Sequence, residues 1–420
     1  MPLAPGDVVE LDVERVAHGG VCVARHDGLA VFVRHALPGE RVRAVVTETR
    51  RDYARADALD VLTAAVGRLE PPCPWARPGL CGGCDWQHAE LPLQRRLKAD
   101  VIAEQLRTLA GLDVDVVVEA VPGDADGLGW RTRVQYAVTP DGTAGLRRHR
   151  SHDVVPIDRC RIAAPGVVEL GVPGLRWPGA EAVEAIAGNG GDRALVVTPR
   201  SSRRRPALPS GDGVSVLLGD GKGGVEAVHG RPGVREGVGD RTFWVGGSGF
   251  WQVHPGAASA LTAAVLDALA PLPGELAVDL YSGVGLFTAA LAGRVGPAGE
   301  VVAIEGAAGA AADARVNLRD LPTVRVHEGR VDATLRRLGL GRVDLVVLDP
   351  PRTGAGADVV ALVAGLAPRT VAYVACDPAA LARDLAGFAG YGYRLDWLRA
   401  FDLFPMTHHV ECVARLAPAT

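Results

Sequence analysis

Lysine is nearly absent from this 420-residue chain, although Lys and Arg together number 45. Only Lys98 and Lys222 are lysines, and this bias, with abundant Ala, Gly and Pro, indicates genome composition more than function. Acidic residues outnumber basic ones, and the formal net charge is −4. Binding to nucleic acid through overall charge is thereby excluded, so any such binding must depend on local basic patches.

Long apolar runs are also absent. No stretch of about 18 apolar residues occurs, which excludes a membrane-spanning helix of ordinary length. The first seven residues lack the charged and apolar segments of a signal peptide. We therefore expect a soluble, cytoplasmic monomer without a membrane partner.

A disulfide framework is the third missing feature. The chain has seven cysteines, an odd number at irregular spacing, and no sign of secretion. Three of them, Cys73, Cys81 and Cys84, lie close together in a loop rich in Pro and Gly, and Cys160 is the candidate fourth partner. Zinc sites usually consist of two separated Cys-x-x-Cys pairs, whereas three thiolates plus a distant one suit an iron–sulfur cluster. We therefore predict a structural [4Fe–4S] cluster, with zinc and unliganded cysteines as the alternatives.

Residues 1–62 are predicted to form a small β-barrel. Gly and Pro separate four alternating apolar runs, which read as short strands: Val8–Val13, Gly20–Ala24, Leu29–Val33 and Glu40–Val46. Strands at this spacing are typical of OB-type barrels, which often bind nucleic acid. The stretch resembles a TRAM domain, an RNA-binding barrel attached to some RNA-modifying enzymes. Because its acids and bases are about equally numerous, a purely structural barrel is the alternative.

Residues 63–245 are interpreted as a small α+β central domain. The segment 89–108 has helical periodicity, and the basic segments Trp130–Tyr136 and Gly145–Asp153 are expected to be strands. Seven arginines against three acids between Arg131 and Arg161, interleaved with aromatic residues, favour contact with RNA over a merely solvated face. Residues 186–241, rich in Gly and Arg, predict only loosely organised strands and loops.

Residues 246–420 alternate between strands and helices, as in a Rossmann-like α/β domain. The segment Glu275–Thr288 predicts a strand, a turn containing Gly283 and Gly285, and the start of a helix. Glu305 closes the next strand and is placed to bind ribose hydroxyls. Thr288 stands where a dinucleotide-binding turn has its third glycine, which favours S-adenosylmethionine over a dinucleotide.

Cys376 is the candidate nucleophile, at the end of the apolar run 370–375. Asp377 is predicted to cap a helix beginning at Pro378, and a thiol facing a helix N-terminus is expected to have a depressed pKa. A buried core cysteine is the alternative. Another predicted strand, 343–348, ends at Asp349-Pro350-Pro351-Arg352. Methyltransferases acting on nucleobase amines usually have an aromatic residue after Pro-Pro, so Arg352 favours covalent activation of a pyrimidine by Cys376 instead.

Five segments together resemble the motifs of the RNA uridine-5-methyltransferase family: Phe250–Pro255, Asp279–Gly285, Asp349–Gly354, Ala375–Pro378 and Phe404–Val413. The resemblance covers nearly the whole chain, including the barrel and the four clustered cysteines. It implies that S-adenosylmethionine is held by Gln252, Tyr281, Glu305 and Asp349. It also implies that Cys376 is the nucleophile and Glu411 the base.

This family's reaction explains those residue types. C5 of uracil is too weakly nucleophilic to take a methyl group, so a Cys376 thiolate at C6 must first create an enolate. Glu411, between apolar neighbours, is expected to have a raised pKa and to remove the C5 proton, with a surface glutamate as the alternative. The target base must be flipped out of its stack. We expect 23S ribosomal RNA as substrate, with transfer RNA and a non-catalytic RNA-binding protein as the alternatives.

Overall fold

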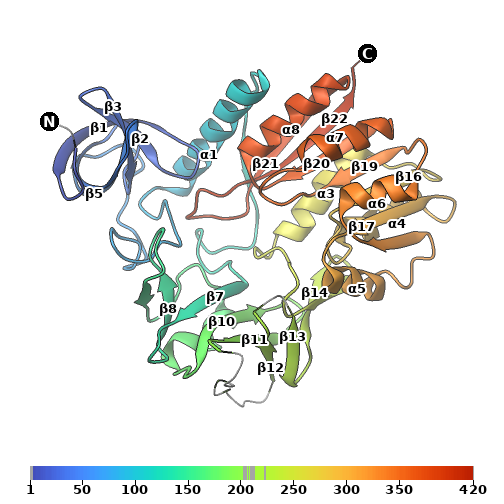
Figure 1. The fold of residues 1–420 in the computed structure, drawn as a ribbon, viewed down its shortest axis with the longest axis horizontal. Coiled ribbons are helices and arrows are strands. Elements are labelled where there is room, and N and C mark those ends of the chain that lie inside the picture. The colour runs from blue at the N-terminus through green and yellow to red at the C-terminus, as the bar shows by residue number, and fades with distance from the viewer. Residues whose placement is uncertain (1–2, 202–205, 207, 209–212, 222–223, 420) are drawn as a thin grey trace.

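The computed structural model describes residues 3–201, 206, 208, 213–221 and 224–419, and it contains a closed barrel and two large sheets. In Figure 1 the blue barrel lies at the upper left, the green sheet at the bottom and the orange-red sheet at the right. Within the described ranges no helix is both long and apolar enough to cross a membrane.

The N-terminal barrel has five strands in the order β1-β2-β3-β5-β4. Their bounds are β1 (Val8–Val16), β2 (Cys22–His26), β3 (Leu29–Arg34), β4 (Arg41–Thr49) and β5 (Tyr53–Thr63). The sequence runs predict the first four strands but not β5. The inward positions of β5 are Ala54, Ala56 and Ala58, so its alternation carries no large apolar side chain.

A helical segment connects the barrel to the C-terminal sheet. It consists of α1 (Leu91–Gln105), the π-helical turn η1 (Leu106–Ala110) and the short strand β6 (Val118–Ala120). Ile102 and Leu106 belong to the core beneath the C-terminal sheet, and β6 pairs in parallel with β21 and forms an edge of that sheet. The division of the chain at residues 62/63 and 245/246 stays a prediction.

The central region is built on a seven-stranded sheet in the order β13-β12-β11-β10-β7-β8-β9. Its elements are β7 (Arg133–Val138), β8 (Ala144–Arg147), β9 (Val154–Pro156), α2 (Pro165–Val168), η2 (Val172–Gly174), β10 (Ala180–Ala187), β11 (Arg193–Pro199), β12 (Val214–Gly219), β13 (Val225–His229) and the hairpin β14 (Gly233–Val238) and β15 (Arg241–Gly246). The strand predicted over 145–153 is too long, because the chain turns back after Arg148, whose N–H bonds to the Asp153 carbonyl. Of the weakly patterned stretch 186–241, residues 202–205, 207, 209–212 and 222–223 lie outside the described residues.

The C-terminal sheet has the order β18-β17-β16-β19-β20-β22-β21-β6, with β18 to β20 parallel. Its elements are α3 (Ala257–Leu269), β16 (Leu276–Leu280), α4 (Leu286–Val295), β17 (Glu300–Glu305), α5 (Ala308–Asn317), β18 (Val324–Glu328), α6 (Val331–Leu338), β19 (Leu345–Leu348), α7 (Gly356–Gly365), β20 (Thr370–Ala375), α8 (Pro378–Gly390), β21 (Tyr393–Asp402) and β22 (Glu411–Pro418). One core joins the sheet to α6, α7 and α8, and a second joins its other face to α3 and α4. Helices therefore cover both faces, which is why every residue of β20 is buried and apolar or Thr. The predicted Rossmann-like α/β class, with its added barrel, is confirmed.

Candidate active site

Cys376 and Glu411 face each other at one edge of the C-terminal sheet. Strand β20 pairs antiparallel with β22, and Ala375 is the partner of Cys412. The next pair along the ladder is therefore Cys376, just after β20, and Glu411, the first residue of β22. Cys376 is half-buried and lines a cavity, so it is not a core cysteine. Glu411 is only 3% exposed, and the alternative of a surface glutamate is wrong.

The charges around Cys376 oppose its ionisation. Burial, followed by the carboxyl groups of Glu411 and Asp349, raises the pKa of the Cys376 thiol to about 12, and Arg352 lowers it in part. The depressed pKa expected from the helix N-terminus is therefore wrong for the ligand-free protein, since desolvation and two carboxyls outweigh the helix. The surroundings of this thiol therefore favour its protonated form.

The pKa of Glu411 is raised well above its usual value, as expected. Burial is the main cause, followed by the neighbouring Asp349 carboxyl, while Arg352 acts in the opposite direction. Burial also raises the pKa of Asp349 to about 7. Two carboxyls and a thiol thus share one poorly hydrated site, where all three cannot be ionised together.

Helix α8 begins as the sequence predicts. The Asp377 carboxylate caps it by accepting a 2.8 Å hydrogen bond from the Ala380 N–H, and Pro378 occupies the first turn. The strand end that carries Cys376 is therefore held between a buried strand and a capped helix.

Three of the four side chains predicted to hold S-adenosylmethionine lie at the carboxyl ends of neighbouring parallel strands. Tyr281 follows β16, Glu305 ends β17 and Asp349 follows β19. Parallel sheets bind ligands along this edge. Gln252 comes from the loop before α3 and is 8% exposed. The neighbouring Val253 carbonyl of that loop accepts hydrogen bonds from the backbone N–H and the hydroxyl of Thr132.

The glycine turn and Glu305 fit the predicted ligand. The two Glu305 carboxylate oxygens accept hydrogen bonds from the N–H groups of Gly283, at 2.8 Å, and Ala307, at 2.6 Å. A carboxylate has further lone pairs, so Glu305 retains acceptors for ribose hydroxyls. Gly283 has φ +55 and open space where a side chain would stand, which leaves its backbone accessible. Gly285 has φ +95, and a Cβ there would lie 2.7 Å from Leu318 Cδ1, so its role is close packing.

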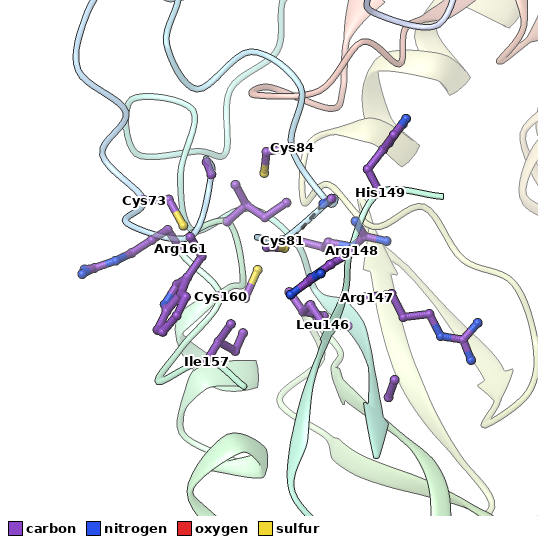
Figure 2. A pocket seen from close by; sticks show the side chains of 18 of the residues that line it. Cys73, Cys81, Cys84, Leu146, Arg147, Arg148, His149, Ile157, Cys160 and Arg161 are labelled. Atoms are coloured by element: carbon purple, nitrogen blue, oxygen red, sulfur yellow. Dashed lines mark hydrogen bonds between the residues drawn. The ribbon is translucent and has the colours of Figure 1, made fainter. Parts of the chain in front are cut away.

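Four cysteine thiols line one cavity of about 400 Å³ in the central region. Figure 2 shows Cys73, Cys81, Cys84 and Cys160 around it, with Arg147, Arg148 and Arg161 nearby. Cys22 and Cys412 lie elsewhere, buried in the barrel and in β22.

A bound metal ion needs its ligands grouped closely around it. In the part of the chain that the structure describes, no three His, Cys, Asp or Glu side chains are grouped closely enough to hold a single ion. The four thiols therefore line the cavity without forming a compact ligand group, and the predicted iron–sulfur cluster stays a prediction. The arginines in the lining would offset the negative charge of thiolates.

Several residues around Cys376 carry no signal in the local sequence. His18, in the barrel, contacts Asp377 although 359 residues separate them. Asp85 bonds to His408 at 2.6 Å across 323 residues. The Arg352 guanidinium lies 3.5 Å from His409 Nε2. Such pairs depend on tertiary packing, and periodicity or spacing along the chain cannot predict them.

Two family models match the amino-acid sequence of this chain. Residues 2–59 match the TRAM domain, and residues 248–417 match tRNA (Uracil-5-)-methyltransferase. A Streptomyces avermitilis protein, described as an uncharacterized RNA methyltransferase, is 54% identical over 99% of both chains. The 23S rRNA (uracil(1939)-C(5))-methyltransferase RlmD of Shewanella baltica is 33% identical, covering 97% of this chain and 95% of that protein. The chain belongs to the S-adenosylmethionine-dependent RNA uracil-5-methyltransferases.

A solved structure supports the fold of this RNA uracil-5-methyltransferase over almost its full length. The tRNA (uracil-54, C5)-methyltransferase of Pyrococcus abyssi, in complex with S-adenosyl-L-homocysteine, aligns with a TM-score of 0.71. The alignment covers 97% of this chain and 99% of that one at 22% identity. The arrangement of barrel, central region and α/β sheet is thus shared by two distant sequences.

Proposed function

We propose that this enzyme methylates C5 of a specific uridine in structured RNA through a covalent bond between Cys376 Sγ and C6 of the base. The observation that carries the proposal is the facing pair at the sheet edge. A thiol beside a cavity lies opposite a buried carboxyl group of raised pKa. Conjugate addition followed by proton removal needs one nucleophile and one base on the same ring, and this pair supplies both.

The first step is the addition of Cys376 to the base. The thiol gives its proton to solvent, its sulfur forms a bond to C6, and the electron pair of the C5–C6 double bond moves toward C4 and O4 to form an enolate. Ionisation of a thiol with a pKa of about 12 is costly in the free enzyme, so we expect the bound uridine and Arg352 to favour it. An uncharged Asp349 would lower that cost, because its carboxylate adds to the effect of burial in raising the pKa of the thiol.

Methylation and release follow. When bound at this site, S-adenosylmethionine would supply an electrophilic methyl group: C5 would form the new C–C bond as the S–CH3 bond breaks, and S-adenosylhomocysteine would leave. Glu411, as a carboxylate, then removes the C5 proton; the electrons of that C–H bond re-form the C5–C6 double bond, and Cys376 leaves as a thiolate. The balance is one methyl group gained by the base and one proton released to solvent.

We assign the cofactor to the carboxyl edge of β16, β17 and β19. Glu305 would accept from the ribose hydroxyls, Tyr281 and Gln252 would line the site, and the open backbone at Gly283 would allow close approach. Asp349 lies between this edge and Cys376, so it is suited to orient both the methyl donor and the base.

We further propose 23S ribosomal RNA as the substrate and a [4Fe–4S] cluster on Cys73, Cys81, Cys84 and Cys160. The Shewanella baltica relative supports ribosomal RNA, since it aligns along nearly its whole length at higher identity than the Pyrococcus abyssi transfer RNA enzyme. Four thiols at one cavity, with arginines around them, support the cluster. It would serve as a clasp that holds loop 73–84 to the loop after β9 that carries Cys160.

The test uses anaerobically purified full-length protein, labelled S-adenosylmethionine, and unmodified 23S ribosomal RNA or transfer RNA in separate reactions. We expect label in 5-methyluridine from ribosomal RNA alone, identified by mass spectrometry of nucleosides. Label from transfer RNA alone would replace the substrate assignment, and no label from either would favour a non-catalytic RNA-binding protein. RNA containing 5-fluorouridine should form a lasting adduct, because a base cannot remove fluorine as a cation. Cys376→Ala should abolish both turnover and the adduct.

A further inference from the structure

A cavity of about 180 Å³ opens beside Cys376, and three separate parts of the chain form its wall. The turn between barrel strands β1 and β2 contributes His18, Gly19 and Gly20. The loop after the clustered cysteines contributes Trp86. The other lining residues come from α1 and the C-terminal region. The barrel therefore contributes directly to the wall of the candidate catalytic pocket.

The barrel turn is fastened to the residue that follows Cys376. His18 Nε2 lies 3.0 Å from Asp377 Oδ2. The other Asp377 oxygen, Oδ1, accepts the capping hydrogen bond from the Ala380 N–H of α8. One carboxylate thus joins the barrel, the helix and the strand end that carries the thiol.

The lack of a side chain at Gly20 allows the turn to pack closely against His408. A Cβ at Gly20 would lie 2.5 Å from His408 Cβ, and the φ of +78 already disfavours a side chain there. The Gly20 carbonyl accepts a 3.0 Å hydrogen bond from the buried Trp86 indole N–H. His408 is itself held by Asp85, at 2.6 Å from its Nδ1. These contacts leave the turn little freedom relative to Cys376.

We propose that the barrel turn 17–21 acts through His18 and Asp377 as a positioning element for Cys376, so that the barrel is part of the catalytic site. The inference rests on the proposed role of Cys376 as nucleophile. His18 is a positioning residue, because it contacts Asp377 and not the reacting atoms.

The charges around this contact indicate the direction of its effect. The hydrogen bond to Asp377 raises the pKa of His18, while partial burial and Arg383 of α8 lower it. Asp377 in turn is among the groups that raise the pKa of the Cys376 thiol. A protonated His18 offsets the Asp377 charge and so favours the thiolate. Because the pair is partly exposed, at 43% and 23%, it adds little to folding stability.

The deciding measurement is the alkylation rate of Cys376 in full-length, RNA-free protein, followed peptide by peptide in a mass spectrometer after iodoacetamide treatment. We expect His18→Ala to lower this rate severalfold and to lower the single-turnover rate of methylation at saturating RNA about tenfold. His18→Gln, whose amide can still donate to Asp377, should recover part of the single-turnover rate. Gly20→Ala, which displaces the turn while keeping His18, should resemble His18→Ala.

The matched control is His26→Ala, a histidine on the same barrel whose ion-pair partner is its neighbour Asp27. It should leave Cys376 alkylation unchanged. An unchanged alkylation rate in both His18→Ala and Gly20→Ala would overturn the inference, whatever happens to RNA affinity, because the barrel would then be only an RNA attachment. Failure of the proposed function is separate, since it appears as turnover that survives Cys376→Ala.

Discussion

The Lys98 ammonium group donates a 2.6 Å hydrogen bond to the Asp402 carboxylate, and both side chains are almost completely buried, at 1% and 2% exposure. Lys98 also bonds to the Phe404 carbonyl at 3.1 Å. One of the two lysines in the chain therefore joins α1 to the end of β21, just before the segment that leads to Glu411. Burial lowers the pKa of Lys98, and the Asp402 carboxylate opposes that change.

Replacing Lys98 with Met should destabilise the C-terminal region by about 3–5 kcal/mol, because it leaves Asp402 buried without its main partner. The double variant Lys98→Met with Asp402→Leu should recover much of that loss, since an apolar pair needs no desolvation of charge. Urea unfolding of the three proteins at pH 7 checks this. Equal stability of the single and double variants would contradict the assignment of Asp402 as the uncompensated charge.

Replacing Glu411 with Gln should stop the reaction after methyl transfer. The amide cannot take the C5 proton, so turnover should fall by about 100-fold or more, and methylated RNA should stay bound to Cys376. The measurement is a denaturing gel of protein incubated with ordinary substrate RNA and labelled S-adenosylmethionine, in which label should run with the protein. The double variant with Cys376→Ala should show no such band. If the Glu411→Gln enzyme turns over normally, the base must be another group.

The raised pKa of Asp279 predicts that folding stability depends on pH. Burial raises its pKa to about 7, the neighbouring Asp349 and Glu305 carboxyls add to the rise, and the hydrogen bond from Thr288 opposes it. The folded state therefore binds the Asp279 proton more tightly than the unfolded state, whose pKa is near 3.8. Its stabilising contribution is complete below about pH 4 and is lost as pH rises to 7.

The variant Asp279→Asn removes this titration while its amide oxygen can still accept from Thr288, at 2.5 Å in the native protein. We expect the variant to match the native protein near pH 4 and to be more stable at pH 8, by on the order of 3 kcal/mol. Urea midpoints at pH 4, 6 and 8 in the absence of S-adenosylmethionine test this. A variant less stable than the native protein at pH 8 would be the opposite result.

The cysteine cavity gives a prediction about metal content. Protein purified without oxygen should hold about four iron atoms and about four inorganic sulfides per chain. Cys81→Ala should lose them, whereas Cys22→Ala should keep them, because Cys22 lies in the barrel core with its thiol bonded to the Ala36 carbonyl. Iron and sulfide assays with visible absorption spectra provide the measurement. One zinc per chain would replace the cluster assignment. If neither iron nor zinc is found, the cysteines are unliganded.

Local patterns along the chain were enough to predict the elements that depend only on neighbouring residues. Alternating apolar runs predicted four strands of the barrel, and the β-branched run before Cys376 predicted β20. The Asp377-Pro378 pair predicted the start of α8, because capping depends only on neighbours in the chain. The buried, raised-pKa environment of Glu411 could be expected from its apolar neighbours. Strand β5 was missed, since alanine at its inward positions gives no alternation of large side chains.

The contacts between these parts, and the pKa values that depend on them, follow from tertiary packing. The pKa of Cys376 is raised and not depressed, because burial and then the carboxyl groups of Glu411 and Asp349, which come from other parts of the sheet, oppose its ionisation. The contact of His18 with Asp377 joins residues 359 apart, and the Lys98–Asp402 pair joins residues 304 apart. Electrostatic energy depends on distance and burial in space, and neither can be obtained from spacing along the chain. The sequence therefore predicted Cys376 and Glu411 as the reacting groups, while the packing of the barrel, α1 and the sheet set their protonation and position.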